Sequence, residues 1–328
     1  MSGAEARGTV GALMSSASPA FAPRPPNKYA GSGLDRLHLK RGDGTWFAQV
    51  LADVATRFLP VWQARNLVDD PAEPGLAWID NGRAAELLQG GAQATLLGQQ
   101  GAELYICLEC SHLETPDHAP ALAGCGHFVD LRTVGPLLPG PTAALLATAR
   151  AYAQWHARHR FCGLCGSPTQ VEEAGHQRRC TNAACGASHF PRTDPAVIML
   201  IHDGRDRAIL GRQTIWPPGM HSVLAGFVEP GESLEEAVAR EVKEEVGIDV
   251  AEVTYHSSQP WPFPSSIMLG FWARALDPRL QVDPHELETA RWISRAEMLA
   301  SPENESFKLP RRDSIARRLI EDWLAATA

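Results

Sequence analysis

The chain has 328 residues, of which 44% are hydrophobic and 21% are charged, a composition typical of folded proteins rather than disordered ones. Its 30 basic and 38 acidic residues give a net charge of −8, which argues against a protein that binds nucleic acid mainly through a broad basic surface. No stretch approaches the roughly 18 consecutive apolar residues that indicate a membrane-spanning helix. We therefore expect no association with a membrane.

The first 28 residues are rich in Ala, Ser, Pro and Gly and lack a continuous apolar stretch behind a basic start. Residues 1–28 are therefore expected to form a flexible tail rather than a secretory signal. The final Ala-Thr-Ala carries no retention or peroxisomal signal. A cytoplasmic protein is the expectation.

The region 29–157 alternates short strand-like runs with helical patches, which predicts an α/β domain. Residues 44–50 and 103–108 are predicted strands. The clearest helix is predicted over residues 142–159, which are rich in Ala and repeat apolar residues at helical spacing. We recognise no internal repeat in the sequence.

The segment 158–190 contains Cys162, Cys165, Cys180 and Cys185 in a C-x2-C-x14-C-x4-C arrangement. Each short pair can turn both sulfurs towards one ion, and four thiolates complete a closed tetrahedral shell. The spacing therefore predicts a structural site for one Zn²⁺ per chain. The alternative, four unrelated buried cysteines, is disfavoured by the glycines beside the pairs.

A second C-x2-C pair, Cys107 and Cys110, is followed by Cys125 and His127. Cys107 lies in the predicted strand 103–108, and a residue three positions further along a strand faces the other side of the sheet. The two sulfurs are therefore not expected to converge on a metal. A second zinc site at this pair is the alternative.

The last region, residues 191–328, is predicted to open with a strand over residues 196–201. It is predicted to close with a helix over residues 314–324, for which Ser314 is a plausible N-cap.

Within this region, an acidic helix carries the strongest chemical signal. Ser233 followed by Glu236 forms a capping box that starts a helix at Leu234. Gly247 stands where that helix would end.

Two glutamates of this helix, Glu241 and Glu245, fall on the same arc as its apolar residues, whereas Arg240 falls on the opposite face, which is expected to meet solvent. Carboxylates one turn apart and partly desolvated repel each other unless a cation lies between them. Glu244 flanks the pair, and Glu232 precedes the helix. Oxygen ligands of this kind suit Mg²⁺ or Mn²⁺.

Residues 226–248 follow the pattern G-x5-E-x7-R-E-V-x-E-E-x-G-I and resemble the Nudix box at every specified position. The resemblance implies that residues 191–328 form an α/β/α sandwich around a mixed sheet. It also implies that the loop and helix present their glutamates to a metal-bound diphosphate. The expected fold is thus α+β: an N-terminal α/β domain, a zinc ribbon and a Nudix domain.

A second motif, at residues 258–266, reads Ser-Gln-Pro-Trp-Pro-Phe-Pro-Ser-Ser. Its three prolines hold the backbone extended in a form that cannot join a central strand. The rings of Trp261 and Phe263 are therefore expected to face outward and to stack on a planar base. A core aromatic cluster and a proline-rich partner-binding segment are the alternatives.

This motif closely resembles the S-Q-P-W-P-F-P-x-S signature of the NADH pyrophosphatase branch of the Nudix family. The resemblance implies metal binding by Glu241, Glu244, Glu245 and Glu286. It implies a nucleotide site lined by Ala225, Phe227, Gln259, Pro260, Trp261, Pro262, Phe263, Pro264, Ser265, Ser266 and Ala316. Phe190 stands where the family often has Tyr, and Arg132 matches a substrate-contacting Arg of the N-terminal domain.

The resemblance implies that water attacks the diphosphate of NADH or NAD, giving AMP and nicotinamide mononucleotide, with Mg²⁺ or Mn²⁺ as the catalytic ions. Glu245 is the candidate for the most critical carboxylate, as a ligand and as the base, although the base differs among Nudix enzymes. The branch also resembles enzymes that remove an NAD cap from RNA. Its members are usually homodimers, so a homodimer is expected.

Two other functions stay open at this point. One is a broader pyrophosphatase of ADP-ribose or nucleotide sugars. The other is a non-catalytic nucleotide sensor or a zinc-ribbon protein that binds nucleic acid.

Overall fold

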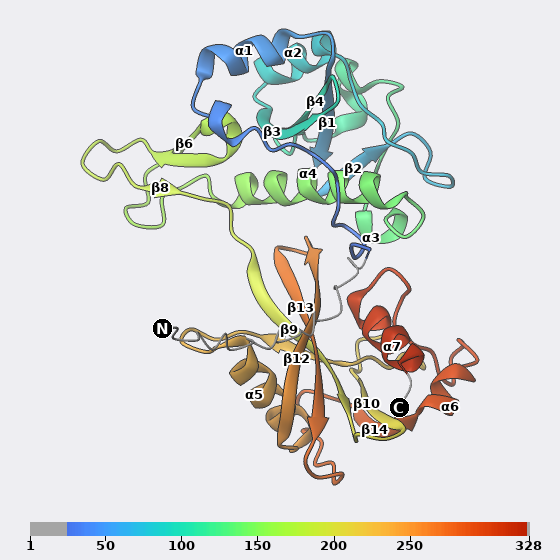
Figure 1. Cartoon of the computed structure of the whole chain (residues 1–328). Coiled ribbons are helices and arrows are strands. Elements are labelled where there is room, and N and C mark those ends of the chain that lie inside the picture. Colours follow the sequence, from blue (N-terminus) through green and yellow to red (C-terminus); the bar gives the residue numbers. More distant parts are fainter. Residues whose placement is uncertain (1–24, 327–328) are drawn as a thin grey trace, which may run out of the picture.

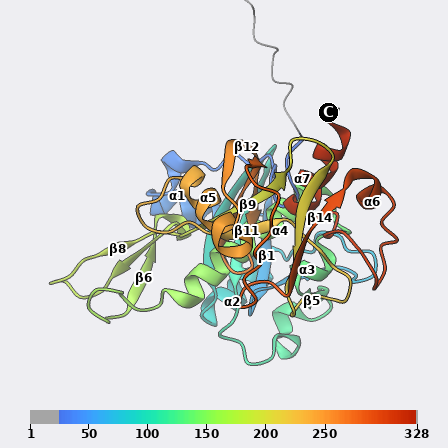
Figure 2. The ribbon, with the colours of Figure 1, turned by 90° about the horizontal axis from the view of Figure 1, so that it is seen from below.

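The computed structural model describes residues 25–326, which form two sheet-based units joined by a small three-stranded ribbon (Figure 1). Seen from below, strands β6 and β8 of the ribbon extend to one side of both units (Figure 2). Among the described residues, no helix is both long and apolar enough to cross a bilayer.

The expected tail, residues 1–28, lies mostly outside the described residues. Its last residues are packed, because the Asn27 amide donates to the Ser258 carbonyl at 2.7 Å.

The N-terminal unit is built on a five-stranded sheet in the order β3-β4-β1-β2-β5, in which only the β1–β4 pair is parallel. Its elements are α1 (Gly44–Ala52), β1 (Thr56–Trp62), β2 (Arg65–Val68), α2 (Asn81–Gln89), β3 (Gln93–Gln100), β4 (Glu103–Glu109), β5 (His127–Val129), α3 (Leu131–Val134) and α4 (Gly140–Arg158). Helix α4 covers one face of the sheet, and α1 and α2 cover the other. The predicted α/β domain is confirmed, as are its strand at 103–108 and its long helix.

The predicted strand at residues 44–50 is wrong, because these residues belong to helix α1. The side chain of Asp43 caps this helix by accepting a hydrogen bond from the Trp46 amide at 2.9 Å. Trp46, Phe47 and Val50 recur at helical spacing, and all three belong to or pack against the core cluster under α1. A short apolar run fits the residue spacing of a strand as well as that of a helix, and here the Asp43 cap favours the helix.

The ribbon consists of β6 (Thr169–Glu172), β7 (Gln177–Cys180) and β8 (Ser188–His189), paired antiparallel in that order. Short 3-10 helices complete the chain before β9, at His38–Lys40, Pro116–His118, Pro120–Leu122 and Glu173–Gly175.

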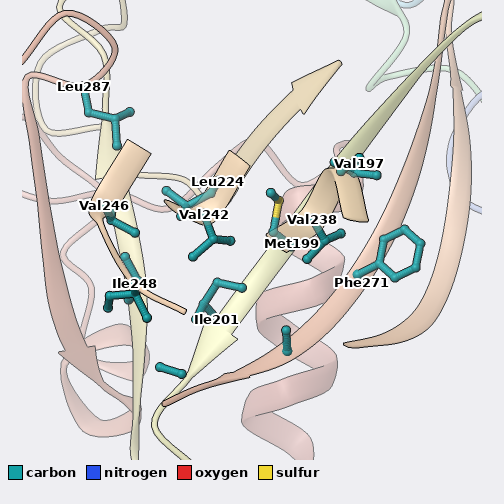
Figure 3. Close-up of a cluster of buried hydrophobic side chains, with 14 residues drawn as sticks. Val197, Met199, Ile201, Leu224, Val238, Val242, Val246, Ile248, Phe271 and Leu287 are labelled. Carbon is teal, nitrogen blue, oxygen red and sulfur yellow. The ribbon is translucent and has the colours of Figure 1, made fainter. Parts of the chain in front are cut away.

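The C-terminal unit has a six-stranded mixed sheet in the order β12-β13-β9-β10-β14, with β11 pairing β9. Its elements are β9 (Asp194–His202), β10 (Arg207–Arg212), β11 (Leu224–Phe227), α5 (Leu234–Val246), β12 (Val250–Trp261), β13 (Ser266–Ala275), β14 (Thr289–Ser294), α6 (Arg295–Leu299) and α7 (Ile315–Ala325). Alternate residues of β9 serve the two faces. Val197, Met199 and Ile201 meet α5 (Figure 3), whereas Ile198 and Leu200 meet α7. The predicted α/β/α sandwich is confirmed.

The two units share one topology although the sequence shows no repeat. In each, a strand pairs parallel with a later strand (β1 with β4, β9 with β13) and antiparallel with the next one (β2, β10). A helix, α2 or α5, then leads into the outer strand, β3 or β12. In the N-terminal unit, the isolated bridge between Phe58 and Ile79 occupies the position that the pairing of β11 with β9 occupies in the C-terminal unit.

Candidate active site

Helix α5 is fixed at both ends as its sequence predicts. The Ser233 hydroxyl accepts from the Glu236 amide at 3.2 Å, and the Glu236 carboxylate accepts from the Ser233 amide at 2.7 Å. Gly247 ends the helix with φ of 74°, a left-handed conformation that costs glycine little. The predicted capping box and helix end are therefore confirmed, and they set which residues face the sheet.

Glu241 and Glu245 lie on the buried face of α5, with 8% and 3% of their surfaces exposed. Glu241 fits there because residue 226 of β11 is glycine: a Cβ on Gly226 would lie 1.8 Å from the Glu241 carboxyl carbon. The close approach of strand and helix thus requires glycine at this position and brings the carboxylate over the sheet edge.

Glu286 joins this pair from the loop between β13 and β14. One carboxylate oxygen from each of Glu241, Glu245 and Glu286 lies within 4.8 Å of the others. The loop is tied to the end of α5, because the Asp283 amide donates to the Glu245 carbonyl at 3.0 Å. Three carboxylates from separate segments therefore face one point.

The electrostatics of the cluster are unfavourable for free carboxylates. Burial, reinforced by the charges of Glu241 and Glu286, raises the pKa of Glu245 to about 8. Within the described residues, Oε2 of Glu245 has no hydrogen-bond partner. A buried oxygen without a partner beside two further carboxylates is the donor set of a hard divalent cation, and the residues present fit such an ion.

Glu244 is the one predicted metal glutamate that lies outside this cluster. Its carboxylate is exposed and accepts from Arg240 at 2.8 Å. Arg240 also donates to Glu232, Glu241 and the Phe227 carbonyl, at 2.5, 2.9 and 2.9 Å. Sequence reasoning missed this role and placed Arg240 on the solvent face. The guanidinium links the loop before α5, the helix and the end of β11.

The four ribbon cysteines converge as predicted. Their Sγ atoms all lie within 4.8 Å of one another, with Cys162 and Cys185 3.8 Å apart and Cys165 and Cys180 3.4 Å apart. A tetrahedral ion with Zn–S bonds of about 2.3 Å has edges of about 3.8 Å. The donor set therefore fits structural zinc. His189 Nε2 lies 3.3 Å from the Cys162 sulfur, a contact that the sequence did not suggest.

Cys107 and Cys110 do not form a second site. Cys107 lies in the cluster between the sheet and α4, and Cys110 lies in the cluster on the other face. Within residues 25–326, neither belongs to a group of ligands that could hold a metal.

The proline-aromatic motif is placed partly as predicted. Pro260 and Trp261 end β12, which is an edge strand, so no central strand contains these prolines. Trp261, Ser265 and Ser266 line a cavity of about 690 Å³ between α4 and the ends of β12 and β13. Pro260, Pro262 and Pro264 line the same cavity.

Phe263 does not face outward, so this part of the prediction is wrong. Its ring is 7% exposed and packs between the two units, with Tyr29 at a centroid distance of 5.7 Å. The guanidinium of Arg150 lies 4.9 Å from the ring centre, and that of Arg132 lies 4.8 Å from it. Arg132 therefore contacts the motif itself, and its substrate role stays a prediction.

Gln259 and Ala316 are placed in the protein interior rather than along this cavity. The Gln259 amide is fully buried, donates to the carbonyls of Lys28 and Asp313, and accepts from the Ile315 amide at 2.8 Å. It joins the N-terminal segment to the start of α7. Ala316 is 5% exposed and packs in the core under that helix.

The remaining predicted residues lie on the surface. Ala225 and Phe227 are exposed on β11, next to the glutamate cluster through Gly226. Phe190 is exposed at the end of the ribbon, and 59% of its surface is open.

Comparison with known families agrees with this arrangement. Residues 192–316 match the NUDIX domain, residues 157–190 match the NADH pyrophosphatase zinc ribbon domain, and residues 55–155 match the NADH pyrophosphatase-like rudimentary NUDIX domain. The chain belongs to the NADH pyrophosphatase branch of the Nudix family. In this branch, the rudimentary domain corresponds to the N-terminal unit, whose topology repeats that of the Nudix unit.

Curated Nudix relatives match the chain over part of their length. The NAD-capped RNA hydrolase NudC of Mycobacterium bovis (strain BCG / Pasteur 1173P2) is 45% identical over 206 residues, covering 60% of this chain and 65% of the relative. The human NAD-capped RNA hydrolase NUDT12 is 43% identical over 192 residues, covering 56% of this chain and 42% of the relative. The chain thus spans less than two thirds of these relatives. A crystal structure of a NUDIX hydrolase from Nitrosomonas europaea superposes with a TM-score of 0.42 at 22% identity, covering 51% of this chain and 90% of that one.

Proposed function

We propose that this chain hydrolyses the diphosphate bond of NADH or NAD, releasing AMP and reduced or oxidised nicotinamide mononucleotide. The observation that carries the proposal is the carboxylate cluster formed by the buried Glu241 and Glu245 and the exposed Glu286, beside the exposed end of β11. The two relatives described above are named as hydrolases of NAD-capped RNA. The proposed substrates therefore include NAD-capped RNA, in which the same bond is cleaved.

The catalytic ions proposed are Mg²⁺ or Mn²⁺, held by Glu241, Glu245 and Glu286, with Glu244 joining after release from Arg240. Such ions neutralise the diphosphate, lower the pKa of the attacking water and stabilise the leaving phosphate. The chain itself supplies two of these carboxylates, Glu241 and Glu245, from a buried helix face, where their charge acts more strongly than in water. Glu245 is proposed both as a ligand and as the group that accepts the proton of the attacking water.

The nucleotide is proposed to bind along the motif wall of the cavity, formed by Trp261, Ser265 and Ser266. Its base would stack on Trp261, which is only half-buried. Phe190, Ala225 and Phe227 are proposed as further contacts, because their exposed surfaces are free to meet a ligand.

The proposal also covers the zinc ion, the domain boundaries, the compartment and the oligomeric state. One zinc ion per chain is proposed at the four cysteines, as a structural ion without an open position. The proposed boundaries are a tail at 1–28, an α/β domain at 29–157, a ribbon at 158–190 and a Nudix domain at 191–328. A cytoplasmic homodimer is proposed as the working form.

The test is a comparison of turnover on NADH, NAD, ADP-ribose and NAD-capped RNA at matched Mg²⁺ or Mn²⁺, with products identified by chromatography. The proposal requires cleavage of NADH or NAD to AMP and the mononucleotide, with kcat/KM above that for ADP-ribose. A higher kcat/KM for ADP-ribose would assign the chain to the broader pyrophosphatases. Absence of hydrolysis with every divalent ion would leave only the non-catalytic sensor.

A further inference from the structure

The cavity beside the proline-aromatic motif has a second wall, and the proposed binding of the dinucleotide along the motif gives this wall no ligand. Besides the motif, it is lined by α4, by the segment before α1 and by the linker between the ribbon and β9. Its volume of about 690 Å³ lies within the range of ligand sites. In Figure 1, α4 lies across the ends of β12 and β13, and the linker runs down beside them.

Four arginines line this cavity: Arg36, Arg41, Arg158 and Arg192. Within residues 25–326, none of them forms an ion pair. Arg36 donates to the Leu97 carbonyl at 3.3 Å and Arg41 donates to the Arg36 carbonyl at 2.9 Å, and both acceptors are neutral. Asp194 is the one acidic residue in the described lining, and its carboxylate accepts from the Ser265 hydroxyl at 2.7 Å.

This concentration of positive charge is unusual for the chain. The net charge is −8, and many arginines elsewhere form ion pairs with carboxylates, as Arg240 does with Glu232 and Arg317 with Glu321. Four uncompensated guanidinium groups around one concavity repel each other and favour an anion with several charges. A chain of phosphodiesters meets that requirement, and arginine binds phosphate oxygens through two donors at once.

The cavity lies close to the proposed reaction centre. Asp194, in the cavity lining, begins β9, and Val197 of the same strand pairs with Gly226, which contacts Glu241. At about 3.3 Å per residue, the two positions on β9 are roughly 10 Å apart. Arg192 precedes Asp194 by two residues, so a nucleotide attached to a dinucleotide at the glutamates would reach this end of the cavity.

We propose that the four arginines bind the phosphodiester backbone of the first nucleotides of a single-stranded RNA whose 5′ end is the NAD cap. The motif wall takes the dinucleotide, and the arginine wall takes the phosphates that follow it. This assignment rests on the proposed function for the position of the cap. It explains how a chain with a net charge of −8 holds RNA: the contact is local and confined to one cavity.

The first experiment measures RNA binding without hydrolysis. The probe is a single-stranded RNA of about 12 nucleotides, similar in length to the site sizes of single-strand-binding domains. It carries a 5′-monophosphate and a 3′ fluorophore and is titrated by anisotropy without divalent ions. The double variant Arg158→Gln/Arg192→Gln should weaken binding about tenfold and reduce the salt slope by about 1.4, since each phosphate contact contributes about 0.7 for single strands.

Matched variants separate charge from fold. Arg205→Gln removes another arginine that lacks an ion pair, in the turn between β9 and β10 at the far end of β9, and should leave RNA affinity unchanged. Arg158→Lys/Arg192→Lys keeps both charges and should restore most of the affinity. Equal RNA affinity in the Gln double variant and wild type, or no measurable RNA binding by wild type, would overturn the proposal.

The second experiment compares NAD-capped RNA with free NADH in steady state. The Gln double variant should raise KM for capped RNA about tenfold with little change in kcat. An equal rise in KM for NADH would place the dinucleotide itself on the arginines and would overturn the proposal. If wild type hydrolyses neither substrate, the proposed function fails, while the anisotropy measurement still decides whether the arginines bind RNA.

Discussion

The N-terminal and C-terminal units have the same strand order and the same parallel pair, yet only one of them assembles a carboxylate cluster. In the C-terminal unit, β11 makes four residue pairs with β9, from Leu224 to Phe227, and its glycine admits Glu241. In the N-terminal unit, the equivalent contact with β1 is the single bridge of Phe58 and Ile79. Among its described residues, no group of potential metal ligands was found.

The helices that follow differ in the same way. On α5, Glu241 and Glu245 are buried beside Val238 and Val242. On α2, the buried residues are Ala84 and Leu87, and Glu86 is exposed. The sheet and its apolar faces are therefore sufficient for the fold, whereas the carboxylate cluster requires two buried glutamates, Glu286 from a loop, and the glycine that admits Glu241. A fold shared by two units does not carry a shared activity.

The largest effect should come from Glu245→Gln, which preserves size and removes one of the crowded charges. We expect kcat for NADH to fall by several powers of ten and Mg²⁺ or Mn²⁺ binding to weaken. Stability without divalent ions should be equal or higher, because a like-charge contact is relieved. Thermal melting without divalent ions and NADH hydrolysis with them measure both effects.

Glu86→Gln on α2 is the matched control for the other unit. Its carboxylate is exposed, so both rate and stability should stay near those of wild type, within about 0.5 kcal/mol of unfolding free energy. A destabilised but nearly fully active Glu245→Gln protein would mean that Glu245 has a structural role and that the two helices do not differ in function.

The ribbon between the units should depend on zinc. Cys165→Ala removes one of four thiolates, so zinc content should fall from about one per chain and the ribbon should lose stability. Elemental analysis with parallel thermal melting provides the measurement. Cys107→Ala is the control and should leave zinc content unchanged, because its thiol lies in the N-terminal core. About two zinc ions in wild type would contradict the assignment of that thiol to the core.

Phe263 joins the two units, so its loss should affect stability more than binding. We expect Phe263→Ala to cost about 3–5 kcal/mol of unfolding free energy, the usual range for a buried phenylalanine. Trp261→Ala, half-buried in the cavity wall, should weaken dinucleotide binding with a smaller loss of stability. Denaturant unfolding measures the loss of stability in each variant, and the KM for NADH measures the loss of dinucleotide binding. If Phe263→Ala weakened binding without loss of stability, Phe263 would contact the nucleotide, and its expected role in joining the two units would be contradicted.

The smallest effect concerns pH. The pKa of Glu245 is raised to about 8 in the folded chain, above the usual 4.5, chiefly by burial. Between these values the folded state holds a proton that the unfolded state has released. Stability without divalent ions should therefore fall as pH rises from 4.5 to 8. The melting temperature of Glu245→Gln should show a flatter profile over this range. Identical profiles for the variant and wild type would show that Glu245 does not titrate there.

The local patterns of the sequence determined the parts of the site that lie within one element. The capping box, the arc shared by Glu241 and Glu245, and the paired cysteines follow from helix periodicity and turn chemistry, which act over a few residues. The family resemblance added Glu286, which lies 41 positions beyond Glu245 by number and has no local pattern of its own. The structure brings its carboxylate to the other two.

Only the tertiary structure decided what each side chain meets when two distant segments pack together. Phe263 and Gln259 belong to a motif whose prolines fix an extended backbone, but their burial depends on Tyr29, Arg150 and the start of α7. Arg240 lies on a helix face that the periodicity assigns to solvent, and the loop before the helix covers it. Likewise, the repeated topology of the two units is invisible in the sequence, because a sheet requires apolar alternation and strand order rather than particular residues.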